Sequence, residues 1–264
     1  MKNYDTEIER IPYMISSARR VVVVTGAGIS TEAGIPDFRG PDGIYRKLGE
    51  ERVMEIINIE AFRRNPGQFY EFHRQHLMNA NVEPSRAHRV LALMEQQGLV
   101  KAIVTQNIDG LHEKAGSKNV IAVHGNAVHF LCTNSGCGRV YDTAYVERCP
   151  DVVPTCEACG GVLKPDVVLF GEPIQHHELA QETILGAELV IVIGSSLVVY
   201  PLAGFVEEYA YRHAALIIIN KGPTALDNMA TIRLDVENTG ILMDEIFRRI
   251  NGKEGREDAY GPPF

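Results

Sequence analysis

The chain is arranged around residues 21–39, which read Val-Val-Val-Val-Thr-Gly-Ala-Gly-Ile-Ser-Thr-Glu-Ala-Gly-Ile-Pro-Asp-Phe-Arg. The valine run is too short for a helix and is closed by Gly26 and Gly28, a pattern typical of a strand buried on both faces of a parallel sheet. In a glycine turn after such a strand, backbone N–H groups can be approached closely by a phosphate. Residues 26–28 therefore indicate a candidate pyrophosphate site.

This segment departs from the usual dinucleotide-binding fingerprint. Thr31 stands where a third glycine is expected, and no second strand with a terminal acidic residue follows about 20 residues later. Taken alone, the glycines fit an ordinary tight turn between a strand and a helix equally well. Asp37, Phe38 and Arg39 favour a binding site, because they follow on a Gly/Pro-punctuated loop at a strand end, where function is concentrated.

Composition limits the possible functions and locations. The 264 residues include 26 Lys and Arg against 34 Asp and Glu, a net charge of −8, which argues against a nucleic-acid partner. The first 12 residues have no apolar signal-peptide region, and no apolar run approaches the length of about 18 residues that a membrane span needs. We therefore expect a cytoplasmic protein with no membrane partner, in which disulfides are disfavoured.

Periodicity predicts a chain in which strands alternate with helices, the pattern of an α/β doubly wound parallel sheet. Polar residues follow several strands directly, as at 106–109 and 124–126. The predicted strands cover residues 21–24, 100–105, 120–123, 167–170, 188–193, 216–219 and 231–234. The predicted helices cover residues 5–18, 50–63, 67–80, 85–97, 176–186, 201–213 and 239–250, and a frayed tail is expected at 252–264.

Four cysteines form two closely spaced pairs, Cys132 with Cys137 and Cys156 with Cys159, and 18 residues separate the pairs. Two such pairs can surround one tetrahedral zinc ion, and a site filled by four thiolates is closed to water and therefore structural. The alternatives are unliganded thiols or disulfides. Cys149 lies between the pairs and has no partner in this pattern.

Together, the motifs resemble those of the sirtuins, the NAD-dependent protein-lysine deacylases. The resemblance covers about residues 20–236 and rests on segments 26–39, 105–109, 124–126, 170–172, 194–196 and 199–201 and on the paired cysteines. It implies a Rossmann-like large part at about 1–40, 85–126 and 166–250. It also implies a smaller module with a helical portion at about 41–84 and a zinc ribbon at about 127–165, with NAD and an acyl-lysine peptide meeting in a cleft between the two parts.

The reaction implied by the resemblance consumes NAD, releases nicotinamide and moves the acyl group to a ribose hydroxyl. His124 is the expected general base, because a histidine with a pKa near 6.5 can accept a proton at neutral pH. A hydrogen-bonded structural histidine is the alternative. Asn107 is expected to act with Asp109 in holding the nicotinamide, Phe38 is expected to cover the reacting ribose carbon, and Arg39 is expected to organise the loop and the phosphates.

The cofactor residues implied by the resemblance come from the ends of several predicted strands. Asn220 matches the family's contact to the adenosine ribose, and the adenine is expected near Val236. Ser195 and Ser196 could bind phosphate or the adenosine ribose through their hydroxyls and N–H groups, or they could simply cap a helix. The full expected set is Gly26, Ala27, Gly28, Ser30, Thr31, Asp37, Phe38, Arg39, Gln106, Asn107, Ile108, Asp109, His124, Gly194, Ser195, Ser196, Asn220 and Val236.

The substrate peptide is expected to add as a strand between two extended segments, with little sequence selectivity. The residues involved would be Val168, Phe170, Gly171, Val198, Val199 and Tyr200. Family members that favour succinyl or malonyl groups carry Tyr-x-x-Arg on a helix, whereas this chain has His73 three residues after Tyr70. We therefore expect acetyl or another neutral acyl group.

Three other functions stay open at this point. One is ADP-ribosyl transfer to protein, which would use the same cofactor. A second is an NAD-binding interaction module without turnover, which would have no need of a base at His124. The third is a dehydrogenase, which would produce NADH and release no nicotinamide.

Overall fold

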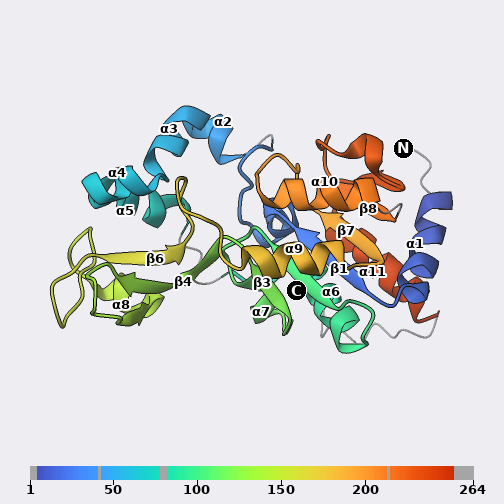
Figure 1. The fold of residues 1–264 in the computed structure, drawn as a ribbon, viewed down its shortest axis with the longest axis horizontal. Coiled ribbons are helices and arrows are strands. Elements are labelled where there is room, and N and C mark those ends of the chain that lie inside the picture. The colour runs from blue at the N-terminus through green and yellow to red at the C-terminus, as the bar shows by residue number, and fades with distance from the viewer. Residues whose placement is uncertain (1–4, 41–42, 78–81, 213–214, 253–264) are drawn as a thin grey trace.

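The computed structural model describes residues 5–40, 43–77, 82–212 and 215–252 (Figure 1). The predicted tail lies outside the described residues apart from Gly252. Figure 1 shows a large sheet with its helices at one end of the molecule and a smaller sheet with short helices at the other.

The large sheet has six parallel strands in the order β3-β2-β1-β7-β8-β9. This order reverses direction between β1 and β7, the arrangement of a Rossmann-like doubly wound fold, which confirms the predicted fold class. Its strands are β1 (Val21–Thr25), β2 (Ala102–Thr105), β3 (Val120–Ala122), β7 (Leu189–Ile193), β8 (Leu216–Asn220) and β9 (Ile232–Asp235).

Helices cover both faces of this sheet. Val21 and Val23 pack in one hydrophobic cluster with α1 (Asp5–Ser17), α6 (Arg86–Gln96) and α11 (Thr239–Ile250). The alternate residues Val22 and Val24 pack in a second cluster with α9 (His177–Leu185) and α10 (Leu202–Arg212). Successive side chains of a strand point to opposite faces, so burial on both sides accounts for the uninterrupted valine run.

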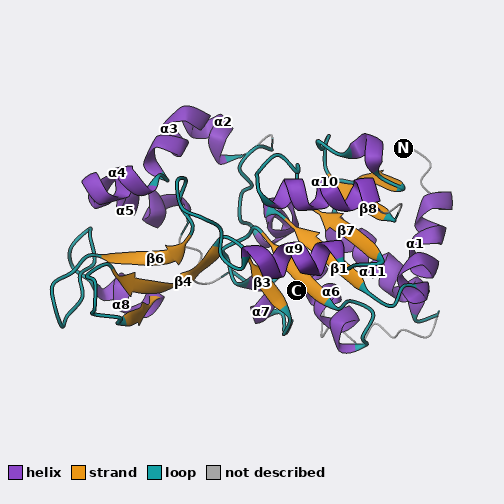
Figure 2. Cartoon of the chain, viewed as in Figure 1, coloured by secondary structure: helices purple, strands orange, loops and turns teal. Residues whose placement is uncertain are grey.

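The smaller sheet is antiparallel, in the order β5-β4-β6, and Figure 2 shows it apart from the parallel sheet. Its strands are β4 (Gly125–Cys132), β5 (Val140–Asp142) and β6 (Leu163–Val167). Phe69, Tyr70 and Phe130 are buried in the hydrophobic cluster that joins this sheet to the nearby helices. The helices of this region are α2 (Ile44–Leu48), α3 (Glu50–Ile56), α4 (Ile59–Arg64), α5 (Pro66–His76) and α8 (Thr143–Arg148).

Three further short helices follow strands of the large sheet in the chain. They are the 3₁₀ helices η1 (Ala27–Ala33) and η2 (Asp227–Met229) and the α-helix α7 (Leu111–Lys114).

The predicted strand at 167–170 is wrong. The strand is β6, four residues earlier, and it belongs to the antiparallel sheet. Residues 168–170 continue as an extended connection, in which Val168 N donates to the His124 carbonyl (2.9 Å) and Phe170 forms an isolated parallel bridge with Asn58. Leu169 of this run is buried in the hydrophobic cluster of the smaller sheet and its helices, so the run does not join the parallel sheet.

The predicted helix at 50–63 is also wrong in its continuity, because it is divided into α3 and α4. Asn58 breaks it by capping α4, since its side-chain oxygen accepts a hydrogen bond from Glu60 N at 2.9 Å. The last part of the predicted helix 67–80 lies outside the described residues, and α5 ends at His76.

Candidate active site

The predicted cofactor residues gather at one edge of the large sheet. Each of the six parallel strands is followed by at least one of them or ends in one, from Gly26 after β1 and Asn220 at the end of β8 to Val236 after β9. In open α/β sheets, ligands bind outside the carboxyl ends of the strands, where the strand order reverses. Here that reversal lies between β1 and β7, so the position of the set fits a dinucleotide.

The glycines at this reversal hold two loops together. Gly28 N donates to the Gly194 carbonyl at 2.8 Å, and a Cβ on Gly28 would lie only 2.8 Å from the Gly194 Cα. Gly194 has a φ of +64°, and a Cβ there would lie 2.3 Å from Ile29 N. The close contact of two backbones therefore requires these glycines, in addition to any approach of a phosphate. Ala27 begins the 3₁₀ helix η1, and the exposed Thr31 hydroxyl donates to the Gly28 carbonyl at 2.9 Å.

Ser30, Asn107 and Asp109 form one hydrogen-bonded group. The buried Ser30 hydroxyl donates to Asp109 Oδ2 at 2.7 Å, and Asn107 Nδ2 donates to Ser30 Oγ at 3.2 Å and to the Gly26 carbonyl at 3.1 Å. Asp109 Oδ1 accepts from Leu111 N at 3.0 Å. The amide and the carboxylate on the loop after β2 are thereby fixed against the loop after β1.

His124 lies between β3 and β4 and is half-buried. Its Nδ1 is 3.0 Å from the Gln106 carbonyl oxygen, which can only accept, so Nδ1 carries the proton. The lone pair of the neutral ring is then on Nε2. Burial lowers the pKa of His124, although the hydrogen bond to Gln106 acts in the opposite direction. The geometry provides a neutral imidazole with a defined tautomer.

Gln106 also connects the sites predicted for NAD and for peptide. Its Oε1 accepts from Ser195 Oγ at 3.2 Å, and its Nε2 donates to the Val199 carbonyl at 3.4 Å. Ser195 Oγ further accepts from Leu197 N at 3.3 Å. Two residues further along this loop, the Ile108 carbonyl accepts a hydrogen bond from Ala127 N at 2.8 Å.

The loop after η1 is attached to the helices of the smaller region. Asp37 Oδ1 accepts from Gly40 N at 2.8 Å, and the Phe38 ring packs edge-on against Tyr45 with 5.4 Å between ring centroids. Arg39 pairs with Glu50 at 3.1 Å and lies 4.9 Å over the Tyr45 ring. Arg39 is therefore held by α2 and α3.

The segments predicted for the peptide differ in exposure. Val198 and Tyr200 are exposed, at 44% and 66%, after the buried Leu197. Phe170 is already paired through its backbone, because Phe170 N donates to the Ile57 carbonyl at 2.9 Å and Ile59 N donates to the Phe170 carbonyl at 3.0 Å. Gly171 follows in the left-handed region, with a φ of +93°.

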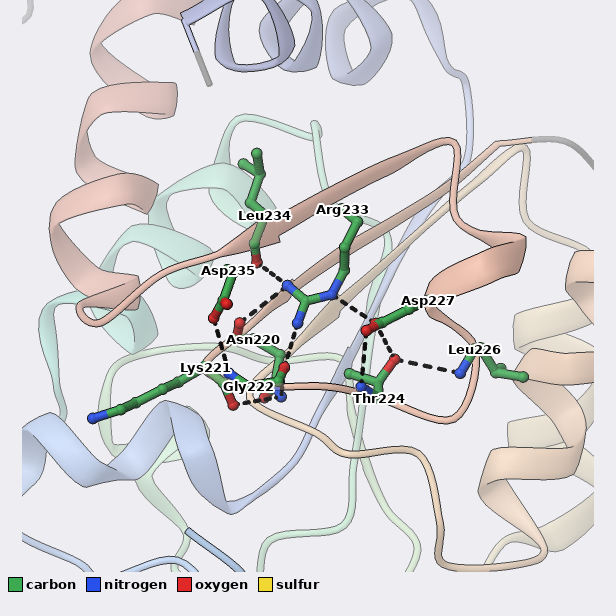
Figure 3. Close-up of polar contacts among 9 residues, drawn as sticks. All are labelled: Asn220, Lys221, Gly222, Thr224, Leu226, Asp227, Arg233, Leu234 and Asp235. Atoms are coloured by element: carbon green, nitrogen blue, oxygen red, sulfur yellow. Dashed lines mark hydrogen bonds and ion pairs between the residues drawn. The ribbon is translucent and has the colours of Figure 1, made fainter. Parts of the chain in front are cut away.

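At the far end of the sheet, Asn220 and Val236 are joined directly, because Val236 N donates to the Asn220 carbonyl at 3.4 Å. Around them lies a group of polar residues that the sequence analysis missed, centred on Arg233 and Asp227 (Figure 3). The available signal was an arginine between Ile232 and Leu234, the two buried residues of β9.

A second missed group is a buried chain of hydroxyls and histidines behind the loop after β2. Thr25 Oγ1 donates to Thr105 Oγ1 at 2.8 Å and lies 2.9 Å from His112 Nε2. The His112 ring is 4.6 Å from that of His88, whose Nδ1 is 2.7 Å from Ser85 Oγ. Two histidines on helix faces that pack inward were the available signal.

The four paired cysteines converge in the structure. Their Sγ atoms all lie within 4.8 Å of one another, with 3.4 Å between Cys132 and Cys159 and 3.7 Å between Cys137 and Cys156. These distances exclude disulfides, whose S–S length is about 2.05 Å. They match the spacing of about 3.8 Å between ligands of tetrahedral zinc with Zn–S bonds near 2.3 Å. Cys149 is not part of this cluster.

Two further contacts orient the thiols of the cluster. The Tyr141 hydroxyl lies 3.0 Å from Cys156 Sγ, and Asn134 Nδ2 donates to Cys159 Sγ at 3.4 Å. Four sulfur ligands leave no open position, so this is a structural zinc site.

The fold and these two sites define a nucleotide-binding α/β protein with a zinc-binding module. Among the described residues, no helix combines the length and apolarity needed to cross a membrane. The model of the Sir2 family matches residues 26–201, and the chain belongs to this family.

Relatives with curated names match most of the chain. The NAD-dependent protein deacetylase of Sulfurisphaera tokodaii is 44% identical over 86% of this chain and 89% of its own length. The NAD-dependent protein deacetylase of Sulfolobus acidocaldarius is 42% identical over 92% of this chain and 95% of its own length. Among solved structures, a Sir2 variant with a deacetylated p53 peptide and 3'-O-acetyl ADP ribose has a TM-score of 0.82, with 36% identity, covering 94% of this chain and 98% of that one.

Proposed function

We propose that this chain removes acetyl groups from protein lysine side chains with NAD as co-substrate, giving nicotinamide, O-acetyl-ADP-ribose and free lysine. The observation that carries this proposal is that Asn107 and Asp109 follow β2 and His124 follows the neighbouring strand β3, with His124 bonded to the same loop through the Gln106 carbonyl, in a chain of the Sir2 family. The relatives' names and the acetylated peptides in related structures support this reaction.

His124 would act as the general base. The Gln106 carbonyl holds Nδ1–H and leaves Nε2 as the acceptor, and partial burial keeps the ring neutral near pH 7. A neutral imidazole can take the proton of a ribose hydroxyl as that oxygen bonds to the acyl carbon. The hydrogen bond through Nδ1 would stabilise the imidazolium that results.

Asn107 and Asp109 would hold the nicotinamide carboxamide before it leaves. Their hydrogen bonds to Ser30 fix both side chains in advance, which reduces the ordering needed when substrate binds. Phe38 is proposed to cover the ribose carbon from the loop after η1, excluding water once nicotinamide departs. The edge-on contact with Tyr45 helps to hold the Phe38 ring in place on that loop.

The preference for acetyl is supported by α5. The Tyr70 hydroxyl donates to the Leu163 carbonyl at 2.7 Å, and burial lowers the pKa of His73 to about 4, so this pair offers no positive charge. Arg74 is directed elsewhere, with Nη2 donating to the Asp151 carbonyl at 3.1 Å. A succinyl carboxylate would find no cation from these three residues.

The proposal is tested by incubating the purified chain with an acetyl-lysine peptide, with and without NAD, and following products by mass spectrometry. We expect NAD-dependent loss of acetyl, one nicotinamide per acetyl removed, and O-acetyl-ADP-ribose. A succinylated version of the same peptide should react at least tenfold more slowly. An unchanged acetyl peptide, with ADP-ribose attached to a protein or with NADH formed instead, would contradict the proposal.

A further inference from the structure

Arg233 binds several backbone carbonyls and one carboxylate at the end of the sheet farthest from β3 (Figure 3). Its Nη1 donates to the carbonyls of Asn220, at 3.1 Å, and of Leu234, and its Nη2 donates to the Gly222 carbonyl. Its Nε donates to Asp227 Oδ1 at 2.6 Å. One side chain of β9 thus holds both ends of the loop that connects β8 to η2.

Asp227 distributes the other contacts of this loop. Its two carboxylate oxygens accept from Thr224, from the hydroxyl at 2.6 Å and from the backbone N at 3.1 Å. Burial would raise the pKa of Asp227, but the hydrogen bonds from Thr224 and Arg233 lower it below its ordinary value. The carboxylate therefore stays charged opposite the guanidinium.

The loop held in this way contacts two of the residues predicted for NAD, Asn220 and Ser196, and Asn220 in turn contacts Val236. Asn220 Nδ2 donates to the carbonyls of Lys221 and Gly222, at 2.9 and 3.2 Å, so the amide's orientation depends on the loop. Ala225 N donates to the Ser196 carbonyl at 3.1 Å, and Val236 N donates to the Asn220 carbonyl at 3.4 Å. The loop thus links the ends of β7 and β8, and Asn220 links β8 to the end of β9.

The fork of the guanidinium is essential to this arrangement. Its donors lie in one plane and reach four acceptors on different segments, which the single ammonium of lysine cannot do. The side chain is 18% exposed, so a lost contact is not freely replaced by water.

We propose that Arg233, through its pair with Asp227, is a positioning residue that presents Asn220, Ser196 and Val236 to the adenosine half of NAD. This inference rests on the proposed function, because it assigns the adenosine to that end of the sheet. Arg233 does not itself contact the reacting atoms. It sets the affinity for the adenosine end and leaves the chemistry at His124 unaffected.

The test compares Arg233→Lys and Asp227→Asn with Arg212→Lys, a matched change in the exposed pair that Arg212 makes with Glu208 on α10. Calorimetric titration with ADP-ribose measures the affinity directly. Steady-state assays give KM for NAD, KM for the acetyl peptide and kcat. Circular dichroism and thermal melts show whether each variant is folded.

For Arg233→Lys and Asp227→Asn, we expect Kd for ADP-ribose and KM for NAD to rise about tenfold, equivalent to about 1.4 kcal/mol. The KM for peptide and kcat at saturating NAD should stay within twofold, and Arg212→Lys should match the wild type throughout. If Arg233→Lys does not fold, Asp227→Asn gives the same test with the arginine in place.

If Arg233→Lys or Asp227→Asn has a lower melting temperature but a wild-type Kd for ADP-ribose, the inference is overturned, because Arg233 would then serve stability alone. A fall in kcat with no change in KM for NAD would also overturn it. If the wild type binds ADP-ribose but deacetylates no peptide, the proposed function fails, whereas the titrations still decide the role of Arg233.

Discussion

The backbone carbonyl of Gln106 decides how the His124 ring can act. With its proton fixed on Nδ1 and its pKa lowered by partial burial, the ring is deprotonated at a lower pH than a free histidine. A general base works only when deprotonated. Activity should therefore persist below the pH at which an ordinary histidine with a pKa near 6.5 would be half protonated.

We predict that kcat/KM rises with pH along an acid limb whose midpoint lies below 6.5, and that His124→Ala lowers kcat by about 10²–10⁴-fold. The measurement is deacetylation of an acetyl peptide from pH 5 to 8, with samples returned to pH 7.5 to confirm that the enzyme is intact. A midpoint at 7 or above would argue that His124 is not the titrating base.

Gly194 is a single residue on which the stability of the contact between the loops after β1 and β7 depends. A Cβ at this position would lie 2.3 Å from Ile29 N, on a backbone that already has a φ of +64°. We predict that Gly194→Ala costs about 1–2 kcal/mol for the left-handed backbone and about 1–3 kcal/mol more for overpacking. Urea denaturation measures this loss.

Gly98→Ala is the matched control for Gly194→Ala. Gly98 has a φ of +75°, but the nearest atom to its added Cβ is the flexible Lys101 Nζ, at 3.6 Å. It should lose only the backbone contribution of about 1–2 kcal/mol. Equal losses of unfolding free energy in the two variants would show that the loops after β1 and β7 can move apart at little cost.

Much of the site is foreseeable from single residues, because polar groups that follow buried strands meet at one edge of a parallel sheet. This reasoning places Asn107, His124 and Asn220 from the sequence. It fails for Arg233, because its acceptors are backbone carbonyls of a loop whose shape no local pattern specifies. It predicts Arg39 on the loop but not its partner Glu50, which belongs to α3.

At the scale of elements, the strands buried on both faces are the ones that the sequence predicts best. β1 and β7 are continuous apolar runs, and each is found within one residue of its predicted bounds. β6 is missed because Pro165 and two polar residues interrupt its pattern, although its side chains alternate between buried and half-buried. The neighbouring run 167–170 is more apolar, but Leu169 is buried against the helices and sheet of the smaller region, a tertiary contact that periodicity does not report.

The antiparallel sheet β5-β4-β6 carries the cysteine cluster at one end, where Cys132 is the last residue of β4. Zinc binding by four thiolates contributes folding free energy directly, because the unfolded chain has no such site. We predict one zinc per chain, and we predict that Cys156→Ser loses the zinc and unfolds this region. Elemental analysis and circular dichroism measure the two effects.

Cys149→Ser is the control for that prediction, because Cys149 lies outside the cluster of four sulfurs. It should keep its zinc and change the free energy of unfolding by no more than about 0.5 kcal/mol. Full zinc content in Cys156→Ser, or loss of zinc from Cys149→Ser, would show that the ligand set is different.

At the scale of the whole molecule, both regions bury histidine rings. His88 and His112 lie in the core beside the large sheet, and His73 lies between Phe69 and Phe130 in the smaller region. Burial is the main cause that lowers the pKa of all three, and for His73 the value is about 4. In the unfolded chain, each would have its ordinary value near 6.5.

Because the unfolded state binds more protons between those values, the free energy of unfolding must fall as pH drops from about 6.5 toward 4. Each buried histidine contributes a slope of up to about 1.4 kcal/mol per pH unit in this window and nothing above it. Urea denaturation at pH 7.5, 6 and 5 measures the slope. His73→Leu replaces one ring that has no hydrogen-bond partner among the described residues, so its slope should be smaller by that one contribution. A variant with the wild-type slope would mean that His73 is protonated in the folded protein, and the smaller region would then not share in the acid sensitivity of the molecule.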